Sequence, residues 1–137
     1  MLISQKTQYA LRAVVELAKH QGLGPTKIAH IAQAQAIPLR FLEVILSQLK
    51  GSGLVESKRG YYGGYFLVKP ADSITVGDII RFMDKSAGPV KCITCVSETN
   101  CPFEGKCSFL PMWTKVQTAI FDIYDTTTIN DLVQSER

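Results

Sequence analysis

All four cysteines of the chain fall in one short stretch, KCITCVSETNCPFEGKC, which ends at Cys107. Two residues separate Cys92 from Cys95, and five residues separate Cys95 from Cys101 and Cys101 from Cys107. Thiolates are soft ligands that select zinc, copper(I) or iron–sulfur clusters. Short spacing lets several sulfurs reach one centre at little cost in chain entropy. The spacing therefore favours a metal centre ligated by these cysteines.

Two other interpretations of the cysteines stay open. Structural zinc sites typically contain two Cys-x₂-Cys knuckles, whereas here only Cys92 and Cys95 have that spacing. A reversible disulfide would make the segment a redox sensor. Alternatively, the cysteines are plain buried residues that neither bind metal nor sense redox state. The two histidines, His20 and His30, are distant in sequence, and we expect them to be ordinary surface or packing residues.

The overall composition indicates a cytoplasmic globular protein. A chain of 137 residues predicts one domain, or one domain with an appendage. No apolar run approaches the roughly 18 residues of a membrane span, and charged residues interrupt the N-terminal stretch, unlike a secretory signal. In the cytoplasm thiols stay reduced, which favours metal binding or redox sensing over a disulfide framework. No nucleophile–base pair, phosphate loop or paired carboxylates indicate an enzyme or a small-molecule substrate.

The charge is divided unevenly between the two halves of the chain. Residues 1–69 contain nine Lys and Arg against three Asp and Glu, whereas residues 70–137 contain six against nine. A basic half is typical of a surface that binds nucleic acid. A merely solubilising surface is the alternative.

Three helices are expected in the basic half. Helical spacing predicts the first over 4–19. Thr26 is expected to cap a short second helix, and residues 33–37 form a tight connection. A third helix begins at Pro38, where a first-turn proline is favoured, and its buried face is read from apolar residues at helical spacing: Leu42, Ile45, Leu46 and Leu49.

The pattern then changes to a hairpin followed by two more helices. Residues 54–58 and 65–69 are expected to be strands joined by the glycine-rich turn RGYYGG. Thr75 and Asp78 have the spacing of a helix cap, and a last helix is expected over 111–125. The tail, 126–137, is expected to be partly ordered at best, although Ile129, Leu132 and Val133 are apolar enough to pack.

Three helices followed by a glycine-tipped hairpin describe a winged helix-turn-helix, so the fold class is mainly α with a small β-hairpin wing. Arginine reaches guanine acceptors and glutamate the cytosine amine from a helix in the major groove, and a wing offers basic and hydroxyl groups to phosphate. The residues expected to contact DNA are Arg40, Glu43, Ser47, Lys58, Arg59, Tyr61 and Tyr62. Alternatively, Glu43 is a solvated charge, and the two tyrosines pack on the hairpin.

These residues together resemble a known family. YALRAVVELA, the segment from Ile37 to Tyr65 (IPLRFLEVILSQLKGSGLVESKRGYYGGY) and the later cysteines followed by Trp113 are similar to the IscR-like (Rrf-two) bacterial winged-helix transcription regulators. The resemblance covers nearly the whole chain. It implies a homodimer in which a long C-terminal dimerisation helix places two winged heads on one pseudo-palindromic operator in double-stranded DNA.

The resemblance also implies an iron–sulfur cluster. Cluster-binding members have Cys-x₅-Cys-x₅-Cys, which Cys95, Cys101 and Cys107 match. The fourth ligand of the family varies: where some members have a histidine this chain has Leu110, and no acidic residue matches the alternative. We therefore expect Cys92 to be the fourth ligand of a [4Fe–4S] or [2Fe–2S] cluster.

The expected organisation follows from these assignments. It is a DNA-binding domain over 1–70, a connecting helix and linker over 71–90, the cysteine segment over 91–108, and a dimerisation helix and tail over 109–137. The expected function is a DNA-binding regulator that senses redox state, nitric oxide or iron–sulfur status. Alternatives are a regulator that uses zinc or cysteine oxidation, and an electron-transfer or cluster-carrier protein.

Overall fold

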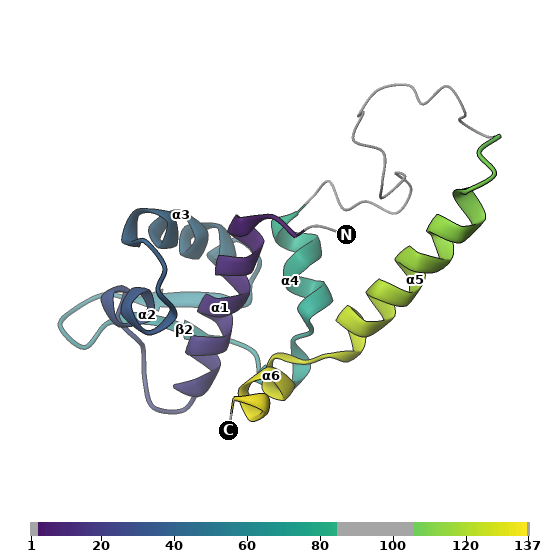
Figure 1. The fold of residues 1–137 in the computed structure, drawn as a ribbon. Helices are drawn as coiled ribbons and strands as arrows, with labels where there is room; N and C mark the ends of the chain where they lie inside the picture. Colours follow the sequence, from purple (N-terminus) through teal and green to yellow (C-terminus); the bar gives the residue numbers. More distant parts are fainter. Residues whose placement is uncertain (1–2, 85–105, 137) are drawn as a thin grey trace.

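The computed structural model describes residues 3–84 and 106–136, and Figure 1 shows its fold. Six α-helices, one two-stranded sheet and a short 3₁₀ helix (η1) make up the described residues. Their order is α1 (Gln5–Lys19), α2 (Ile28–Gln35), α3 (Leu39–Lys50), β1 (Val55–Lys58), β2 (Gly64–Leu67), η1 (Ala71–Ser73), α4 (Val76–Met83), α5 (Leu110–Thr126) and α6 (Ile129–Ser135). The predicted fold class, mainly helical with a small hairpin, is confirmed.

Helix α1 is the centre of the head, by which we mean α1–α4, the hairpin and α6. Ser4 caps it, because the Ser4 hydroxyl accepts a hydrogen bond from the backbone N–H of Thr7 at 3.2 Å. Its buried face continues through Ala10, Val14 and Leu17, and it contacts α2, α3, α4 and α6. The helix predicted over 4–19 is confirmed, with Ser4 as the cap rather than a helical residue.

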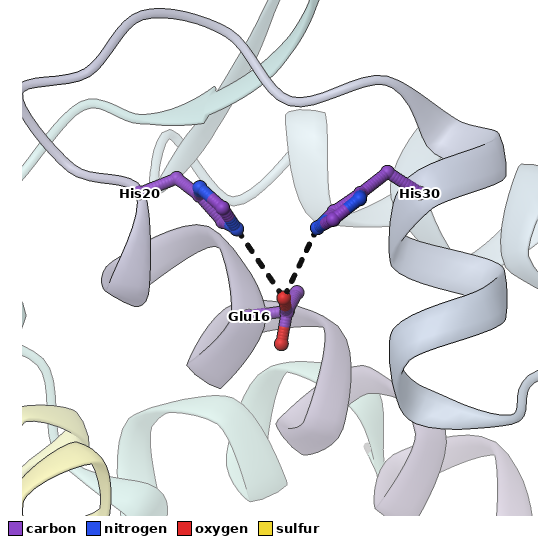
Figure 2. A group of neighbouring side chains, drawn as sticks. All are labelled: Glu16, His20 and His30. Carbon is purple, nitrogen blue, oxygen red and sulfur yellow. Dashed lines mark hydrogen bonds and ion pairs between the residues drawn. The ribbon is translucent and has the colours of Figure 1, made fainter.

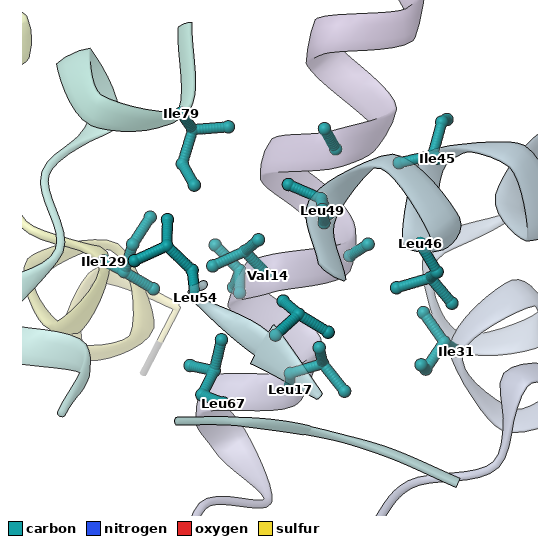
Figure 3. Close-up of a cluster of buried hydrophobic side chains, with 14 of the residues drawn as sticks. Val14, Leu17, Ile31, Ile45, Leu46, Leu49, Leu54, Leu67, Ile79 and Ile129 are labelled. Atoms are coloured by element: carbon teal, nitrogen blue, oxygen red, sulfur yellow. The ribbon is translucent and has the colours of Figure 1, made fainter. Parts of the chain in front are cut away.

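The buried face predicted for α3 is also confirmed. Leu42, Ile45, Leu46 and Leu49 are at most 2% exposed, and α3 packs on α1 and α2. Figure 3 shows Ile45, Leu46 and Leu49 within this core. Spacing of three and four residues puts them on one side of the helix. Pro38 is the N-cap, one position before the expected first turn, where its fixed φ of −58° still suits the start of a helix. The packing of α3 therefore leaves its opposite side free.

The turn between α2 and α3 is shorter than expected. Helix α2 continues to Gln35, so residues 33–35 are helical and the connection begins at Ala36. Ala36 adopts the left-handed conformation, with φ 53° and ψ 46°, which lets the chain reverse between the two helices. A residue with a Cβ rarely adopts this conformation.

The assignment of Thr26 as a helix cap was wrong. Helix α2 begins at Ile28, and Lys27 occupies the N-cap position without a side-chain hydrogen bond. Thr26 instead pairs with Tyr65 through both backbone N–H···O bonds, each 2.8 Å long. Its extended backbone therefore continues the sheet on the free edge of β2, because the pairing with Tyr65 outweighs the local preference of threonine for a cap.

The hairpin has the expected position and a close contact that explains one of its glycines. β1 and β2 are antiparallel, with Val55 opposite Leu67 and Lys58 opposite Gly64. Gly64 has φ 154°, and a Cβ at this position would collide with the backbone carbonyl of Thr26. Only glycine lets the sheet approach the segment before α2 this closely.

The tail is better ordered than expected. Thr128 and Asp131 form a capping box that starts α6, like the Thr75–Asp78 box that starts α4. Ile129 is fully buried in the core, and its N–H donates to the carbonyl of Ile74 at 2.8 Å. The expectation of partial order was wrong, and the alternative that apolar tail residues pack on the head is confirmed.

Helix α5 extends away from the head (Figure 1) and packs on it through α4. The fork of Arg81 on α4 donates two hydrogen bonds of 2.6 Å to the carboxylate of Asp125 near the end of α5. A hydrogen bond from Arg81 and its charge lower the pKa of Asp125, against a smaller opposing effect of burial. The expected division of the chain into four functional segments stays a prediction.

Candidate nucleic-acid interface

The outer face of α3 carries the residues predicted to read DNA bases. Arg40, Glu43 and Ser47 are all exposed, at spacings of three and four residues, so they lie on one side of the helix. Phe41 and Val44 beside them are 60% and 54% exposed. Apolar groups on such a face can contact the methyl group of thymine. The structure thus presents one free mixed surface on the second helix of the helix-turn-helix.

The wing tip carries the other predicted contacts. Lys58, Arg59, Tyr61 and Tyr62 are exposed, and the tyrosines are 82% and 83% exposed. The two tyrosine rings meet edge to face with centroids 5.0 Å apart. Both hydroxyls therefore remain available at the tip, and the alternative that these tyrosines pack down on the hairpin is not what the structure shows.

Lys27 belongs to the same region but is absent from the sequence-based set. Its ammonium group lies 5.7 Å from the centre of the Tyr61 ring, within the range of a cation–π contact. The contact joins the wing tip to the start of α2, across a wing that is also fixed there by the Thr26–Tyr65 pairing. The sequence shows a lysine next to the expected start of the second helix. Only the pairing of the wing with Thr26 places that lysine beside Tyr61.

The glycines of the wing allow its tight turn. Gly60 has φ 112°, and the N–H of Gly63 donates to the carbonyl of Gly60 at 2.9 Å. A Cβ at Gly63 would collide with the carbonyl of Lys58. The tip is therefore a compact turn that exposes both basic side chains and tyrosine hydroxyls.

The predicted cysteine ligands fall mostly outside the described residues. Cys92, Cys95 and Cys101 belong to the range 85–105, which the structure does not describe. Cys107 is a free, partly buried thiol, and its carbonyl accepts a hydrogen bond of 3.2 Å from the N–H of Leu110 at the start of α5. The structure therefore places the last of the four thiols directly before α5 and tests no ligand assignment.

Glu16, His20 and His30 form a cluster, whereas the sequence predicted only ordinary surface or packing roles for the two histidines. The Nε2 atoms of both rings point to Oε1 of Glu16, at 3.3 Å from His20 and 3.5 Å from His30 (Figure 2). Glu16 and His20 are four residues apart on α1, which was visible in the sequence. The approach of His30 depends on how α2 packs on α1.

A helix-turn-helix followed by an antiparallel wing, with a free polar face on its second helix, defines a winged-helix DNA-binding protein. Solved structures agree. CymR of Bacillus subtilis, the global cysteine regulator, superposes with a TM-score of 0.80 at 38% identity and 98% coverage of both chains. IscR of T. potens gives a TM-score of 0.77 at 31% identity, covering 100% of this chain and 89% of that one.

Sequence comparison identifies the family. The Rrf2 family model, described as an iron-dependent transcriptional regulator, matches residues 3–135. The HTH-type transcriptional regulator CymR of B. subtilis is 39% identical over 132 residues, which are 96% of this chain and 89% of CymR. IscR of Erwinia tasmaniensis is 35% identical over 136 residues, 99% of this chain and 81% of IscR. The chain belongs to the Rrf2 family and is a DNA-binding transcription regulator.

Proposed function

We propose that this regulator acts as a homodimer whose affinity for its operator depends on an iron–sulfur cluster ligated by Cys92, Cys95, Cys101 and Cys107. The observation that carries the proposal is the spacing of the four thiols within sixteen residues. The chemistry of this donor set fits an iron–sulfur cluster, since all-thiolate ligation is typical of both common cluster types. Such a cluster would supply a centre that responds to oxidation, nitric oxide or loss of iron.

The position of the cysteines in the chain supports a link to DNA binding. Helix α4, which packs on α1, ends at Met83, and Cys107 lies three residues before α5. With their thiols gathered at one centre, the cysteines would constrain the connection between the head and α5. If α5 pairs with its partner copy, that constraint changes the separation of the two α3 helices, and hence the fit to two half-sites.

In this proposal the residues of α3 and the wing divide the work on DNA. Arg40 and Glu43 would contact base edges, and Ser47 either bases or phosphate. Lys58, Arg59 and the hydroxyls of Tyr61 and Tyr62 would contact phosphates. Lys27 would add a positive charge next to Tyr61, so that α2 and the wing tip approach the same stretch of backbone. The regulator would work in the cytoplasm.

A second candidate function differs only in the sensor. The described family is iron-dependent, but one similar protein is named a global cysteine regulator, and CymR of Staphylococcus aureus in its oxidized form matches with a TM-score of 0.75 at 32% identity over 97% of this chain and 96% of that one. An oxidized relative favours reversible oxidation of these thiols as the alternative to a cluster. Zinc ligation by the same thiolates is the remaining alternative.

One experiment separates the sensors. Protein purified without oxygen is analysed for visible absorption, iron, sulfide and zinc in the same sample, and then for operator binding at constant salt. We expect visible absorption with matched iron and sulfide, and loss of both in Cys101→Ser. Cys92→Ser then tests the fourth ligand. One zinc per chain in a colourless sample, or no metal even after anaerobic reconstitution, would exclude the iron–sulfur cluster. The DNA-binding part of the proposal would not be affected.

A second experiment tests the DNA contacts. Arg40→Ala is expected to relax the sequence preference at one base pair. The loss of binding free energy for the preferred base should be about 1–3 kcal/mol. Arg59→Ala is expected to weaken all sequences alike and to lower the salt dependence by about one phosphate contact. Lys115→Ala removes the same charge from exposed α5 and serves as the matched control. If all three variants behave alike, the assigned interface is wrong.

A further inference from the structure

We propose that Glu16, His20 and His30 form a binding site for a divalent transition metal of the zinc class, separate from the cysteines. The three side chains lie where the end of α1 meets α2 (Figure 2). Their candidate ligand atoms all lie within 4.8 Å of one another. Two imidazoles and one carboxylate are a common ligand set for Zn²⁺ and Fe²⁺ with open positions for water.

The two distances from Glu16 to the histidines match the ligand separations of a metal site. The contacts from Oε1 of Glu16 to the two Nε2 atoms, 3.3 and 3.5 Å, are longer than a good N–H···O bond. A cation that binds nitrogen and oxygen at about 2.0–2.1 Å separates its tetrahedral ligands by about 3.3–3.4 Å. The rings of His20 and His30 stand at 85° to each other with centroids 5.0 Å apart, and both present Nε2 to the Glu16 carboxylate (Figure 2).

The carboxylate is held in the orientation that such a site requires. Glu16 is only 5% exposed, and a buried carboxylate is costly unless it is paired. Its other oxygen, Oε2, accepts a 2.8 Å hydrogen bond from the amide of Gln35, which leaves Oε1 to face the imidazoles. A hydrogen bond to the oxygen that does not bind the ion is the usual way in which proteins orient a ligand.

Burial alone would raise the pKa of Glu16. The hydrogen bond from Gln35, the charge of Lys19 and the contact with His20 outweigh that effect, so the net pKa lies below its usual value. The carboxylate is therefore ionised at neutral pH. A metal ion could reach it from solvent, since the His20 and His30 side chains are 33% and 54% exposed.

One neighbouring charge opposes metal binding. The Lys19 ammonium lies 3.5 Å from Oε2 of Glu16, and it also pairs with Glu136 on α6. The negative charge of Glu136 partly offsets the positive charge that Lys19 places near the site. Since Lys19 is on the Oε2 side, it does not occupy the place between Oε1 and the two rings. Its charge gives the proposal a second test.

The test uses the full-length chain with all four cysteines changed to serine, which removes the competing thiolates. The chain has only two histidines, so ring ¹⁵N NMR during a Zn²⁺ titration reports on His20 and His30 alone. We expect both Nε2 signals to move together and to saturate at one equivalent. His30→Ala should weaken binding at least about tenfold. Rings that do not respond, or only one that does, would overturn the proposal.

The second variant is Lys19→Met, which leaves all three ligands in place. Removing a like charge near the ion should tighten Zn²⁺ binding about fivefold or more, whereas Lys115→Met, far along α5, should not change it. Unchanged affinity in Lys19→Met would mean that the ion does not bind beside the Glu16 carboxylate, and it would overturn the proposed site. Since the variant used in these titrations has no cysteines, neither result depends on the proposed iron–sulfur cluster.

Discussion

Helices α3 and α5 differ sharply in what their apolar residues contact. Helix α3 has twelve residues, and four of them are buried against α1 and α2. Helix α5 has seventeen residues and none is buried, although Met112, Val116 and Ile123 are all apolar and 39–64% exposed. An apolar face of this length, which the described part of the chain does not cover, is typical of an interaction surface. Hydrophobic spacing therefore predicts an apolar face without telling which element covers it.

The largest loss of stability is expected when α3 loses a side chain from the core of the head. Leu46→Ala removes a fully buried side chain, and we expect it to lower the free energy of unfolding by about 2–5 kcal/mol. Denaturant unfolding followed by circular dichroism measures the loss. Val44→Ala on the exposed side of the same helix is the control and should cost less than about 0.5 kcal/mol. Equal losses would mean that the two faces of α3 are not distinguished as described.

Helix α5, which we call the arm, should respond differently, through a change in assembly. Ile123 is 64% exposed, so Ile123→Asp should leave the unfolding of the head unchanged. If α5 pairs with a second copy, a carboxylate placed in that apolar contact should weaken dimerisation by about 100-fold or more. Sedimentation over a range of concentrations measures the change. Asp122→Asn, the neighbouring exposed position, is the control. A dimer that tolerates Ile123→Asp would exclude this face of α5 from the interface.

A third change affects the head through its backbone. In Gly64→Ala the new Cβ would collide with the Thr26 carbonyl, so the wing must move away from α2, at about 2 kcal/mol or more. Gly53→Ala is the matched control, because Gly53 has φ 78° but a Cβ there would have open space. It should cost about 1 kcal/mol, since only the backbone conformation is strained there. Operator binding should fall in Gly64→Ala at temperatures where both variants remain folded.

The residues that sequence reasoning placed correctly depend on local pattern. Leu42 to Leu49 repeat at helical spacing, and the Thr75–Asp78 cap needs only its own turn. The Thr26 assignment failed because its pairing partner, Tyr65, is distant in sequence. The tail carried the same capping signature at Thr128, but Ile129 is buried by α1 and by η1, which are distant from it in sequence.

The candidate site shows the same division between local and distant information. Arg40, Glu43 and Ser47 follow from the buried face of α3, since whatever is not buried must point outward. The approach of Lys27 to Tyr61 depends on the wing meeting the start of α2. His30 reaches Glu16 only because α2 packs across the end of α1. Pairs of this kind come from tertiary packing, which spacing along one helix does not encode.

The smallest effect is expected where the head meets the arm. Arg81 lowers the pKa of Asp125 in the folded protein, so this pair stabilises the fold at pH values above the ordinary pKa of an aspartate. The contribution is lost as the pH falls through the lower, folded pKa. Because the two side chains are 48% and 41% exposed, solvent screening keeps it to about 0.5 kcal/mol.

Asp125→Asn should remove that contribution near neutral pH and leave stability in strong acid unchanged. Thermal unfolding at a series of pH values measures the difference, with Asp122→Asn on the same helix as the control. A gap between wild type and Asp125→Asn that persists at the lowest pH would mean that Asp125 holds α5 on α4 through packing rather than charge. In that case the junction between head and arm would be as insensitive to ionisation as the core beneath α3.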